Sequence, residues 1–248
     1  MIERAAILAA GRGTRLGGLT ADRPKPMVLL LGKPVLEHIL LRLANVGLRE
    51  FILVIGYRGE VIQSYFGDGA PWGWRISYVS QPTPSGTGSA LAQARDLAGS
   101  GPVVASFGDI LTDGANYRRL LEDYRVAPCA AVVGINYVED VSAGSAVTMQ
   151  GSRVVHVVEK PLPGTTESHW NLAGVSVYGA AIWPALAALK PSARGEYELT
   201  DGVGALIASG EEVRAVKIEG FWSDVGTPEA LRSAEEHLAV EIGEPPLA

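Results

Sequence analysis

The sequence predicts an α/β protein: a Rossmann-like three-layer sandwich with a mostly parallel central sheet, continued by a second half with a mixed sheet. Up to about residue 126, buried apolar runs alternate with helical patterns, which is typical of a parallel sheet covered by helices on both faces. After residue 130, strand-like runs follow one another, and Gly-Ser separates two of them as a hairpin signal. The 248 residues are 47% hydrophobic and 19% charged, which allows a sizeable core.

Strands and helices alternate through the first half of the chain. The run FILVIG at 51–56 is short and β-branched, as a buried strand is, whereas 34–47 has apolar residues at helical spacing and stops at Gly47. The same criteria give strands at 4–10, 51–56, 74–79 and 102–107, and helices at 34–47, 58–66, 85–97 and 116–126.

The second half is richer in strands. We expect strands at 130–138, 145–150, 153–160, 174–178 and 213–218, and helices at 180–189, 196–208 and 228–240. The uncharged stretch 170–189 is about as long as a membrane span, but Asn171, Gly174, Gly179 and Pro184 divide it into a strand and a short helix. We therefore expect this stretch in the core of a soluble protein.

The chain reads as one domain with two halves. We expect this domain at 1–240, divided into 1–112 and 113–240, with a loose tail at 241–248. No internal repeat or low-complexity linker interrupts it. The apolar part of the first ten residues is too short for a signal peptide, so a cytoplasmic location is expected.

Charge and cysteine content exclude several classes of function. A net charge of −6 argues against nucleic acid or an anionic membrane as the main partner, and leaves homo-oligomerisation open. The single cysteine, Cys129, forms no internal disulfide and is expected to be buried. The histidines are scattered without zinc-ligand spacing. However, four cations against one acid lie between residues 12 and 25, and this local excess favours a small anionic ligand.

Glycines accompany these cations. Gly11, Gly13, Gly17 and Gly18 follow the first strand, so their backbone N–H groups can surround an anion while Arg15 and Lys25 neutralise its charge. An ordinary glycine turn with solvated arginines is the alternative for GxG alone. Neither G-x-x-x-x-G-K-[ST] nor G-x-G-x-x-G is present, which disfavours a P-loop and an NAD-dependent oxidoreductase.

Three marked segments follow strands of the predicted parallel sheet. They are the glycine loop, QPTPSGTG at 81–88 and Gly-Asp at 108–109. Ligands of open α/β sheets bind beyond the carboxyl ends of the strands, so one shared site is expected there.

The stretch from Leu8 to Met27, LAAGRGTRLGGLTADRPKPM, resembles the signature of the sugar-1-phosphate nucleotidyltransferases. The resemblance continues in order through GKPVLEHIL, YFGDG, QPTPSGTGSAL, FGDILTD, VVEKP, EYELTD and FWSDVGTPEAL, to about residue 232. It implies that 1–112 is a nucleotide-binding half and 113–240 a sugar-binding half. Relatives with two activities add a C-terminal acyltransferase of hexapeptide repeats, and we expect this chain to be the single-domain form.

The resemblance also implies roles for individual residues. Arg15 and Lys25 contact the reacting phosphates as catalytic groups, and Asp109 and Asp224 hold Mg²⁺, which suits hard oxygen ligands. The nucleotide-binding residues it implies are Leu8, Ala10, Gly11, Gly13, Thr14, Gln81, Gly86, Thr87 and Gly108. The sugar-phosphate-binding residues it implies are Gly144, Glu159, Lys160 and Leu172. Taken alone, Asp109 could cap a turn, and Glu159 with Lys160 could form a surface ion pair.

One position departs from the pattern of the family. Leu172 stands where many members have an asparagine, which in the N-acetylglucosamine enzymes faces the acetamido group. Leucine makes no such hydrogen bond, so a hexose 1-phosphate such as glucose 1-phosphate is favoured. Asn171 is expected on the opposite face of its strand, unless a bulge turns it toward the sugar.

The implied reaction is transfer of a nucleotidyl group from a nucleoside triphosphate, with UTP or dTTP favoured, to a sugar 1-phosphate. The attacking phosphate is already ionised, so the reaction needs positioning and charge neutralisation rather than a general base. Two alternatives stay open: a non-catalytic regulator that binds nucleotide sugars, and a cytidylyltransferase that acts on a phosphorylated amino-alcohol.

Overall fold

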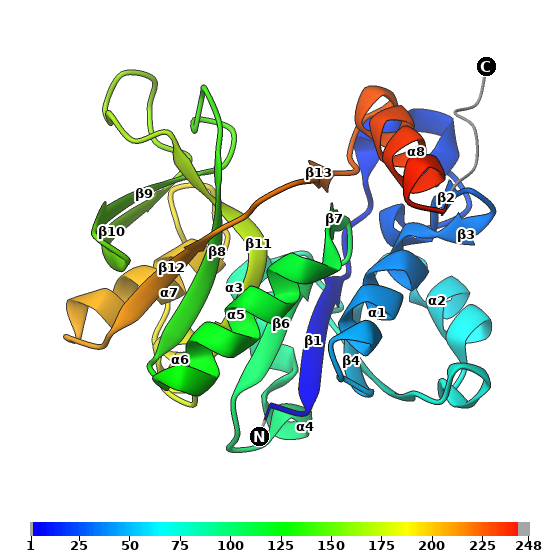
Figure 1. Ribbon diagram of the computed structural model, residues 1–248, viewed down its shortest axis with the longest axis horizontal. Helices are drawn as coiled ribbons and strands as arrows, with labels where there is room; N and C mark the ends of the chain where they lie inside the picture. The colour runs from blue at the N-terminus through cyan, green and yellow to red at the C-terminus, as the bar shows by residue number, and fades with distance from the viewer. Residues whose placement is uncertain (1, 243–248) are drawn as a thin grey trace.

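A sheet of nine strands runs through the computed structural model, which describes residues 2–242 (Figure 1). The strand order is β5-β4-β1-β6-β11-β8-β12-β10-β9. The strands are β1 (Arg4–Ala9), β4 (Glu50–Ile55), β5 (Arg75–Ser80), β6 (Val103–Phe107), β8 (Ala131–Tyr137), β9 (Ser145–Gln150), β10 (Arg153–Glu159), β11 (Trp170–Tyr178) and β12 (Val213–Lys217).

The direction of the strands changes along this sheet. β5, β4, β1 and β6 are parallel neighbours, as the alternating first half of the sequence predicts. β11 is antiparallel to both β6 and β8, β12 is parallel to β8, and β10 is antiparallel to β12 and β9. The mixed part therefore continues the parallel part within one sheet.

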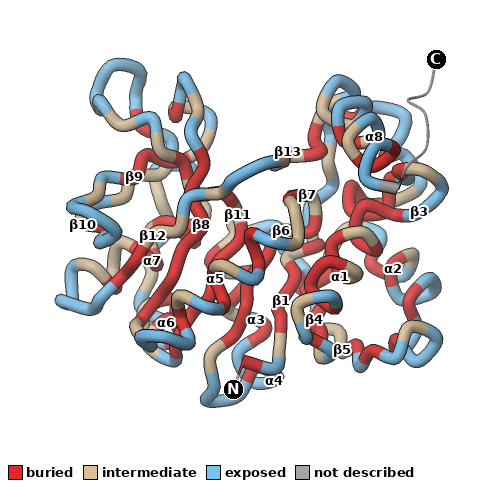
Figure 2. Tube along the Cα trace, viewed as in Figure 1, coloured by how far each residue is buried: buried red, intermediate tan, exposed pale blue. Residues whose placement is uncertain are grey.

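Helices cover both faces of the sheet. One core cluster contains side chains from α1 (Val35–Asn45), α2 (Gly59–Phe66), α5 (Gly114–Val126) and α8 (Pro228–Ile242). A second contains side chains from α3 (Thr87–Gln93), α4 (Arg95–Ala98), α6 (Ile182–Ala187) and α7 (Leu199–Ala208). Along β1, Ala5 and Ile7 belong to the first cluster and Ala6 to the second, which is the alternation of a strand buried on both faces. Figure 2 shows that burial follows the central strands and that exposure follows the loops at their ends.

Several short elements were not expected from the sequence. The short β-strands form two small sheets, β2 (Leu29–Leu30) with β3 (Lys33–Pro34) and β7 (Ile110–Thr112) with β13 (Trp222–Asp224). The 3₁₀ helices are η1 (Thr14–Thr20), η2 (Lys25–Met27) and η3 (Ala70–Trp72). The four strands, η2 and η3 have only two or three residues, which is too short to show a hydrophobic period. The seven residues of η1 lie in the glycine loop, where no such period is present.

Most expected bounds lie within two residues of the observed ones, and the main differences concern four elements. The helix expected at 85–97 is divided into α3 and α4. The helix expected from 196 begins at Leu199, because Glu198 is in an extended conformation and the N–H of Tyr197 donates to the carbonyl oxygen of Ser85. The strand expected from 174 begins at Trp170, since Trp170 to Leu172 pair with β8. α8 continues to Ile242, so the expected tail does not start at 241, and residues 243–248 lie outside the described part.

The uncharged stretch 170–189 divides into β11 and α6, as expected. Among residues 2–242, no helix has the length and apolar character needed to cross a bilayer.

Candidate active site

Two adjoining cavities lie beyond the carboxyl ends of β1, β5 and β6. The smaller, of about 240 Å³, is lined on these ends by Ala10, Gln81 and Asp109, which belong to the three segments expected to share a site. The larger, of about 400 Å³, extends over the mixed part of the sheet. Thr87, Phe107, Asp109 and Glu196 line both, so the cavities meet at these residues.

The glycine loop places its backbone against a lysine. Gly13 has a φ of 73°, and a Cβ atom there would lie 2.5 Å from Cβ of Lys25. Only glycine fits this close approach without strain. The buried Thr20 hydroxyl donates to the carbonyl oxygens of Gly13 (3.0 Å) and Gly17 (3.2 Å) and so folds the loop back on itself. The predicted Leu8, Ala10 and Gly11 line the smaller cavity.

The lysine brings the two predicted carboxylates together. Nζ of Lys25 donates to Oδ2 of Asp109 (2.6 Å) and to Oδ1 of Asp224 (2.5 Å), and only 6% of the Lys25 side chain is exposed. Nη2 of Arg15 lies 3.2 Å from Oδ2 of Asp224 at the open side of the cluster. The two predicted catalytic cations and the two predicted metal ligands therefore form one cluster.

This cluster suits a divalent cation. Two carboxylates already converge on a positive group, and their hard oxygen atoms are the ligands that Mg²⁺ prefers, with its other positions left for water and phosphate oxygens. Over residues 2–242, no three His, Cys, Asp or Glu side chains gather at one point. The pair Asp109 and Asp224 could hold a metal ion only together with water or phosphate oxygens.

A second pair of predicted residues meets on the other side of the smaller cavity. Nε2 of the buried Gln81 donates to the carbonyl oxygen of Gly86 at 3.0 Å. Gly86 has a φ of 107°, and a Cβ atom there would lie 2.5 Å from the carbonyl oxygen of Tyr197. The hydroxyl of Thr87 accepts the N–H of Leu199 at 3.0 Å. The 81–87 segment is therefore docked on the polypeptide that precedes α7.

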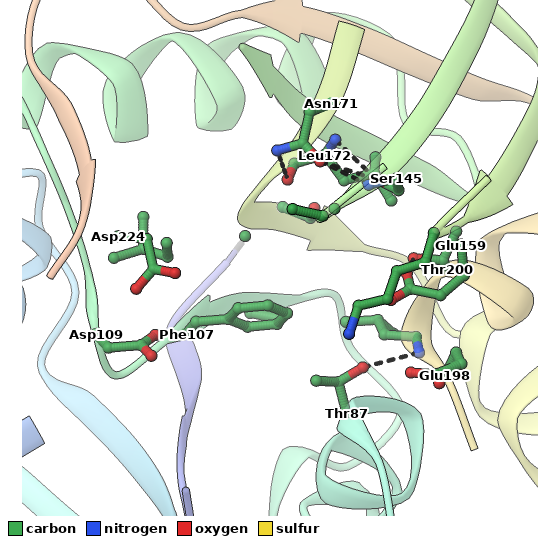
Figure 3. Close-up of a pocket in the computed structure, with 18 of the residues that line it drawn as sticks. Thr87, Phe107, Asp109, Ser145, Glu159, Asn171, Leu172, Glu198, Thr200 and Asp224 are labelled. Carbon is green, nitrogen blue, oxygen red and sulfur yellow. Dashed lines mark hydrogen bonds between the residues drawn. The ribbon is translucent and has the colours of Figure 1, made fainter. Parts of the chain in front are cut away.

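The predicted sugar-side residues line the larger cavity (Figure 3). Oε2 of Glu159 accepts the Thr200 hydroxyl at 2.7 Å, and the N–H of Lys160 donates to the carbonyl oxygen of Gly144 at 2.7 Å. Lys160 has a φ of 42°, which turns the chain sharply at the end of β10. In Figure 3, Asp109 and Asp224 lie on one side of this cavity, and Glu159 lies on the opposite side.

Asn171 and Leu172 both line the larger cavity, so the expectation that Asn171 lies away from it is wrong. The register of β11 against β8 shifts between Leu172 and Ser176, and the bulge contains Gly174 with a φ of 74°. The side-chain amide of Asn171 is, however, already hydrogen-bonded within the protein. Its Oδ1 accepts the N–H (2.8 Å) and hydroxyl (3.2 Å) of Ser145, and its Nδ2 donates to Oδ1 of Asn136 (3.1 Å) and to the Leu172 carbonyl oxygen (2.9 Å). Both N–H bonds and two acceptor positions of the amide are used within the protein.

Three predicted residues lie outside the lining of both cavities, as far as the described chain shows. Gly13 and Thr14 form the turn before Arg15. The N–H of Gly108 donates to the carbonyl oxygen of Leu8 at 2.9 Å, and a Cβ atom at Gly108 would meet that oxygen at 3.1 Å. The close approach of β1 to the 107–109 turn accounts for this glycine.

An acidic and basic cluster in the larger cavity was not singled out from the sequence. Nη2 of Arg194 lies 2.7 Å from Oε2 of Glu196 and 2.9 Å from Oε1 of Glu198, and its Nη1 lies 3.9 Å from Oε1 of Glu159. Burial, and after it the charge of Glu159, raises the pKa of the Glu198 carboxyl above its ordinary value. The charge density of RGEYE at 194–198 was the available signal.

The comparisons with known proteins agree with this geometry. Residues 4–241 match the family described as "Nucleotidyl transferase". The chain is 33% identical over 249 residues to UTP–glucose-1-phosphate uridylyltransferase AglF of Haloferax volcanii, covering 96% of this chain and 97% of that one. It is 32% identical over 242 residues to glucose-1-phosphate thymidylyltransferase of Streptomyces griseus, covering 98% and 67%.

Other relatives are longer than this chain, which spans 64% of one and 55% of several that are described as bifunctional. Among solved structures, UDP-glucose pyrophosphorylase complexed with UDP-glucose superposes with a TM-score of 0.87 at 23% identity, covering 97% of this chain and 100% of that one. This likeness confirms the predicted fold class.

Proposed function

Because this chain belongs to the nucleotidyl transferase family, we propose that it transfers a nucleotidyl group from a nucleoside triphosphate to a sugar 1-phosphate and releases pyrophosphate. The triphosphate is UTP or dTTP and the sugar is a hexose such as glucose. The similar proteins named as a glucose-1-phosphate uridylyltransferase and a glucose-1-phosphate thymidylyltransferase support both halves of this proposal.

The convergence of Asp109 and Asp224 on Lys25, where the two cavities adjoin, carries the proposal. Two substrates that react with each other must bind side by side, and the group transferred between them is anionic. A cavity for each substrate, with a cluster of cations and metal-binding carboxylates at their junction, is suited to that chemistry.

In the proposed complex, the nucleotide occupies the smaller cavity, which is lined mostly by residues of the 1–112 half. The glycine loop provides backbone N–H groups toward the triphosphate, and the Gln81–Gly86 pair lies where a base edge can form hydrogen bonds. The N–H groups and amide of such a pair suit the carbonyl and imide groups that uracil and thymine share.

The sugar 1-phosphate occupies the larger cavity, which is lined mostly by residues of the 113–240 half. Glu159 provides a carboxylate for sugar hydroxyls, and Lys160 provides a cation for the sugar phosphate. Arg194 lines the same cavity, and we add it to Lys160 as a second cation for this phosphate.

The chemical step depends on orientation and on charge. An oxygen of the ionised sugar phosphate attacks the α-phosphorus in line, and pyrophosphate leaves on the opposite side. Arg15 and Lys25 stabilise the negative charge that builds on the departing pyrophosphate. Asp109 and Asp224 would hold a Mg²⁺ ion, which would supply further neutralisation of phosphate charge.

The larger cavity favours a hydroxyl over an acetamido group at the C2 position of the sugar. Leu172 has no hydrogen-bonding side chain, and the amide of Asn171 is already satisfied by Ser145, Asn136 and the Leu172 carbonyl. An acetamido group would therefore be buried without a side-chain partner at this point.

We also propose a cytoplasmic location, because nucleoside triphosphates are made there.

A matrix of nucleoside triphosphates against sugar 1-phosphates, scored by pyrophosphate release, tests the proposal. We expect release to require Mg²⁺ and to be fastest with glucose 1-phosphate and UTP or dTTP. Tight binding of a nucleotide sugar with no pyrophosphate release for any pair would instead support the regulator. Release only with CTP and a phosphorylated amino-alcohol would support the cytidylyltransferase.

A further inference from the structure

The two strands that bring Asp109 and Asp224 together are too short to hold their own register. β7 and β13 have three residues each, and Asp224 pairs with Ile110 directly after Asp109. A two-stranded pair of this length is unstable alone, and a slip of one residue would turn the Asp224 side chain to the other face. Another part of the protein must therefore fix this register.

Side chains at the end of β7 and just after it form hydrogen bonds with the polypeptide that enters β13. Nδ2 of Asn116 donates to the carbonyl oxygen of Glu219 at 2.8 Å, and its Oδ1 accepts the N–H of Glu219 at 3.0 Å. Oδ2 of Asp113 accepts the N–H of Phe221 at 2.9 Å, and the Thr112 hydroxyl donates to the Phe221 carbonyl oxygen at 2.8 Å. Asn116 and Thr112 are buried, so the bonds that their side chains form are partly shielded from water.

A histidine from the C-terminal helix completes this set of contacts. Nε2 of His237 lies 3.0 Å from Oδ1 of Asp113 and donates to it, because a carboxylate oxygen only accepts. The imidazole also stacks on the Phe221 ring, with 4.0 Å between centroids and 6° between planes. Both carboxylate oxygens of Asp113 are thus engaged, one by the segment before β13 and one by α8.

A glycine makes room for this carboxylate. Gly220 has a φ of 69°, and a Cβ atom there would lie 2.3 Å from Oδ2 of Asp113. The segment 219–221 is therefore shaped around Asp113 as well as bonded to it. Figure 1 shows that this segment crosses from β12 to β13, between the two halves of the molecule.

We infer that Asp113 is a positioning residue for Asp224, and that His237 and Asn116 act with it. Asp113 acts through the register of β13 and touches no reacting group. This inference rests on the proposed function, because Asp113 affects the reaction only by positioning Asp224, the carboxylate proposed to bind the metal. Residues that orient metal ligands typically affect metal affinity or activity by about 10- to 100-fold.

The test replaces Asp113 by alanine and His237 by alanine or glutamine. We expect Asp113→Ala to raise the Mg²⁺ concentration for half-maximal velocity about tenfold or more and to lower kcat, while KM for the sugar 1-phosphate changes by less than about twofold. His237→Gln, which keeps an N–H donor, should recover much of what His237→Ala loses. The matched control is Arg119→Ala, which removes only the 2.8 Å ion pair with the Glu219 side chain on the same segment and should leave these constants within about twofold.

Hydrogen exchange at Val225 gives a measurement that does not depend on activity. Its N–H donates to the carbonyl oxygen of Asp109 at 2.9 Å and so reports the register directly. Exchange at Val225 should be faster in Asp113→Ala and in His237→Ala. If Asp113→Ala does not fold, His237→Ala is the milder variant that still gives the measurement. A fall in Tm with unchanged Mg²⁺ requirement, kcat and Val225 exchange would overturn the inference. If the unmodified protein releases no pyrophosphate with any pair, the proposed function fails, while the exchange at Val225 still tests these contacts.

Discussion

Asp224 lies 199 residues after Lys25 in the chain, yet its Oδ1 atom is 2.5 Å from the Nζ atom of Lys25. The same ammonium group lies 2.6 Å from Asp109, so a side-chain cation binds both of the carboxylates proposed to hold Mg²⁺. A metal ion bound to the same two oxygen atoms would lie close to the ammonium group and would be repelled by it. We therefore expect Lys25 and a metal ion to compete for these two carboxylates in the nucleotide-free protein.

Lys25→Met should strengthen metal binding by the nucleotide-free protein. Methionine fills the buried path of the lysine and removes the competing charge, and we expect affinity for Mn²⁺ to rise about tenfold, roughly 1.4 kcal/mol. Electron paramagnetic resonance of free Mn²⁺ measures this without turnover. The control is Lys33→Met, an exposed lysine paired with Glu37. Equal Mn²⁺ affinity in the Lys25 variant and the unmodified protein would contradict the competition.

Asp109→Ala and Asp224→Ala should each reduce turnover by orders of magnitude and leave the fold intact. Each substitution removes one of two protein ligands of the proposed metal, and neither side chain is in the apolar core. Steady-state kinetics with Mg²⁺, and circular dichroism for the fold, give the result. Removal of metal by chelation should abolish activity, and added Mg²⁺ should restore it. Near-normal activity in one variant would show that the replaced residue is not a required metal ligand.

Arg15→Ala should lower kcat far more than it raises KM for the triphosphate. The Arg15 side chain is 65% exposed, and its guanidinium lies at the open side of the carboxylate cluster, where we propose that pyrophosphate leaves. Loss of a preorganised donor of this kind costs about 10²- to 10³-fold in kcat. Arg12 offers a control in the same loop, because its guanidinium lies over the Tyr57 ring instead, so Arg12→Ala should have a smaller effect. A change confined to KM would assign Arg15 to ground-state binding.

Leu172→Asn should narrow the preference for glucose 1-phosphate over N-acetylglucosamine 1-phosphate. A buried polar group without a partner costs about 1–3 kcal/mol, or roughly one to two decades in kcat/KM, and the new amide would provide that partner. The ratio of kcat/KM for the two sugars measures the effect. Asn171→Ala is the informative companion: it should weaken both sugars alike, because this amide holds Ser145 in place. A better rate with N-acetylglucosamine 1-phosphate in the unmodified protein would refute the argument from Leu172.

The stability of Glu198→Gln relative to the unmodified protein should increase with pH. Burial and Glu159 raise the pKa of the Glu198 carboxyl above its ordinary value of 4.5, so the folded protein favours the protonated form. Below pH 4.5 the Glu198 carboxyl is mostly protonated, and the destabilising carboxylate forms as pH rises through the raised pKa. Glutamine carries no charge at any of these pH values, so the variant is not destabilised in this way. Melting temperatures of both proteins from about pH 4.5 to 7.5 test this, with the exposed Glu60→Gln as control. A difference in Tm that stays constant across this range would contradict the prediction.

Much of the fold could be predicted because its main elements are long enough to show a period. The parallel order of β5, β4, β1 and β6 follows from apolar runs that alternate with helices such as α1 and α5. The site could be predicted in part because its residues follow those apolar runs directly. They are the glycines of the loop after β1 and the carboxylate of the 108–109 turn. Such signals are local, so they can be recognised in a single segment of the sequence.

The sequence by itself determined the fold class and the segments that make the site. Only the tertiary structure decided which side chains of those segments meet. The pairing of β7 with β13 joins residues more than a hundred positions apart through three residues on each strand, which leaves no local period. Asn171 and Leu172 both line the larger cavity, although alternation separates neighbours in a regular strand. Contacts of this kind depend on register and on the packing of distant elements, and neither is written in the residue types of any one segment.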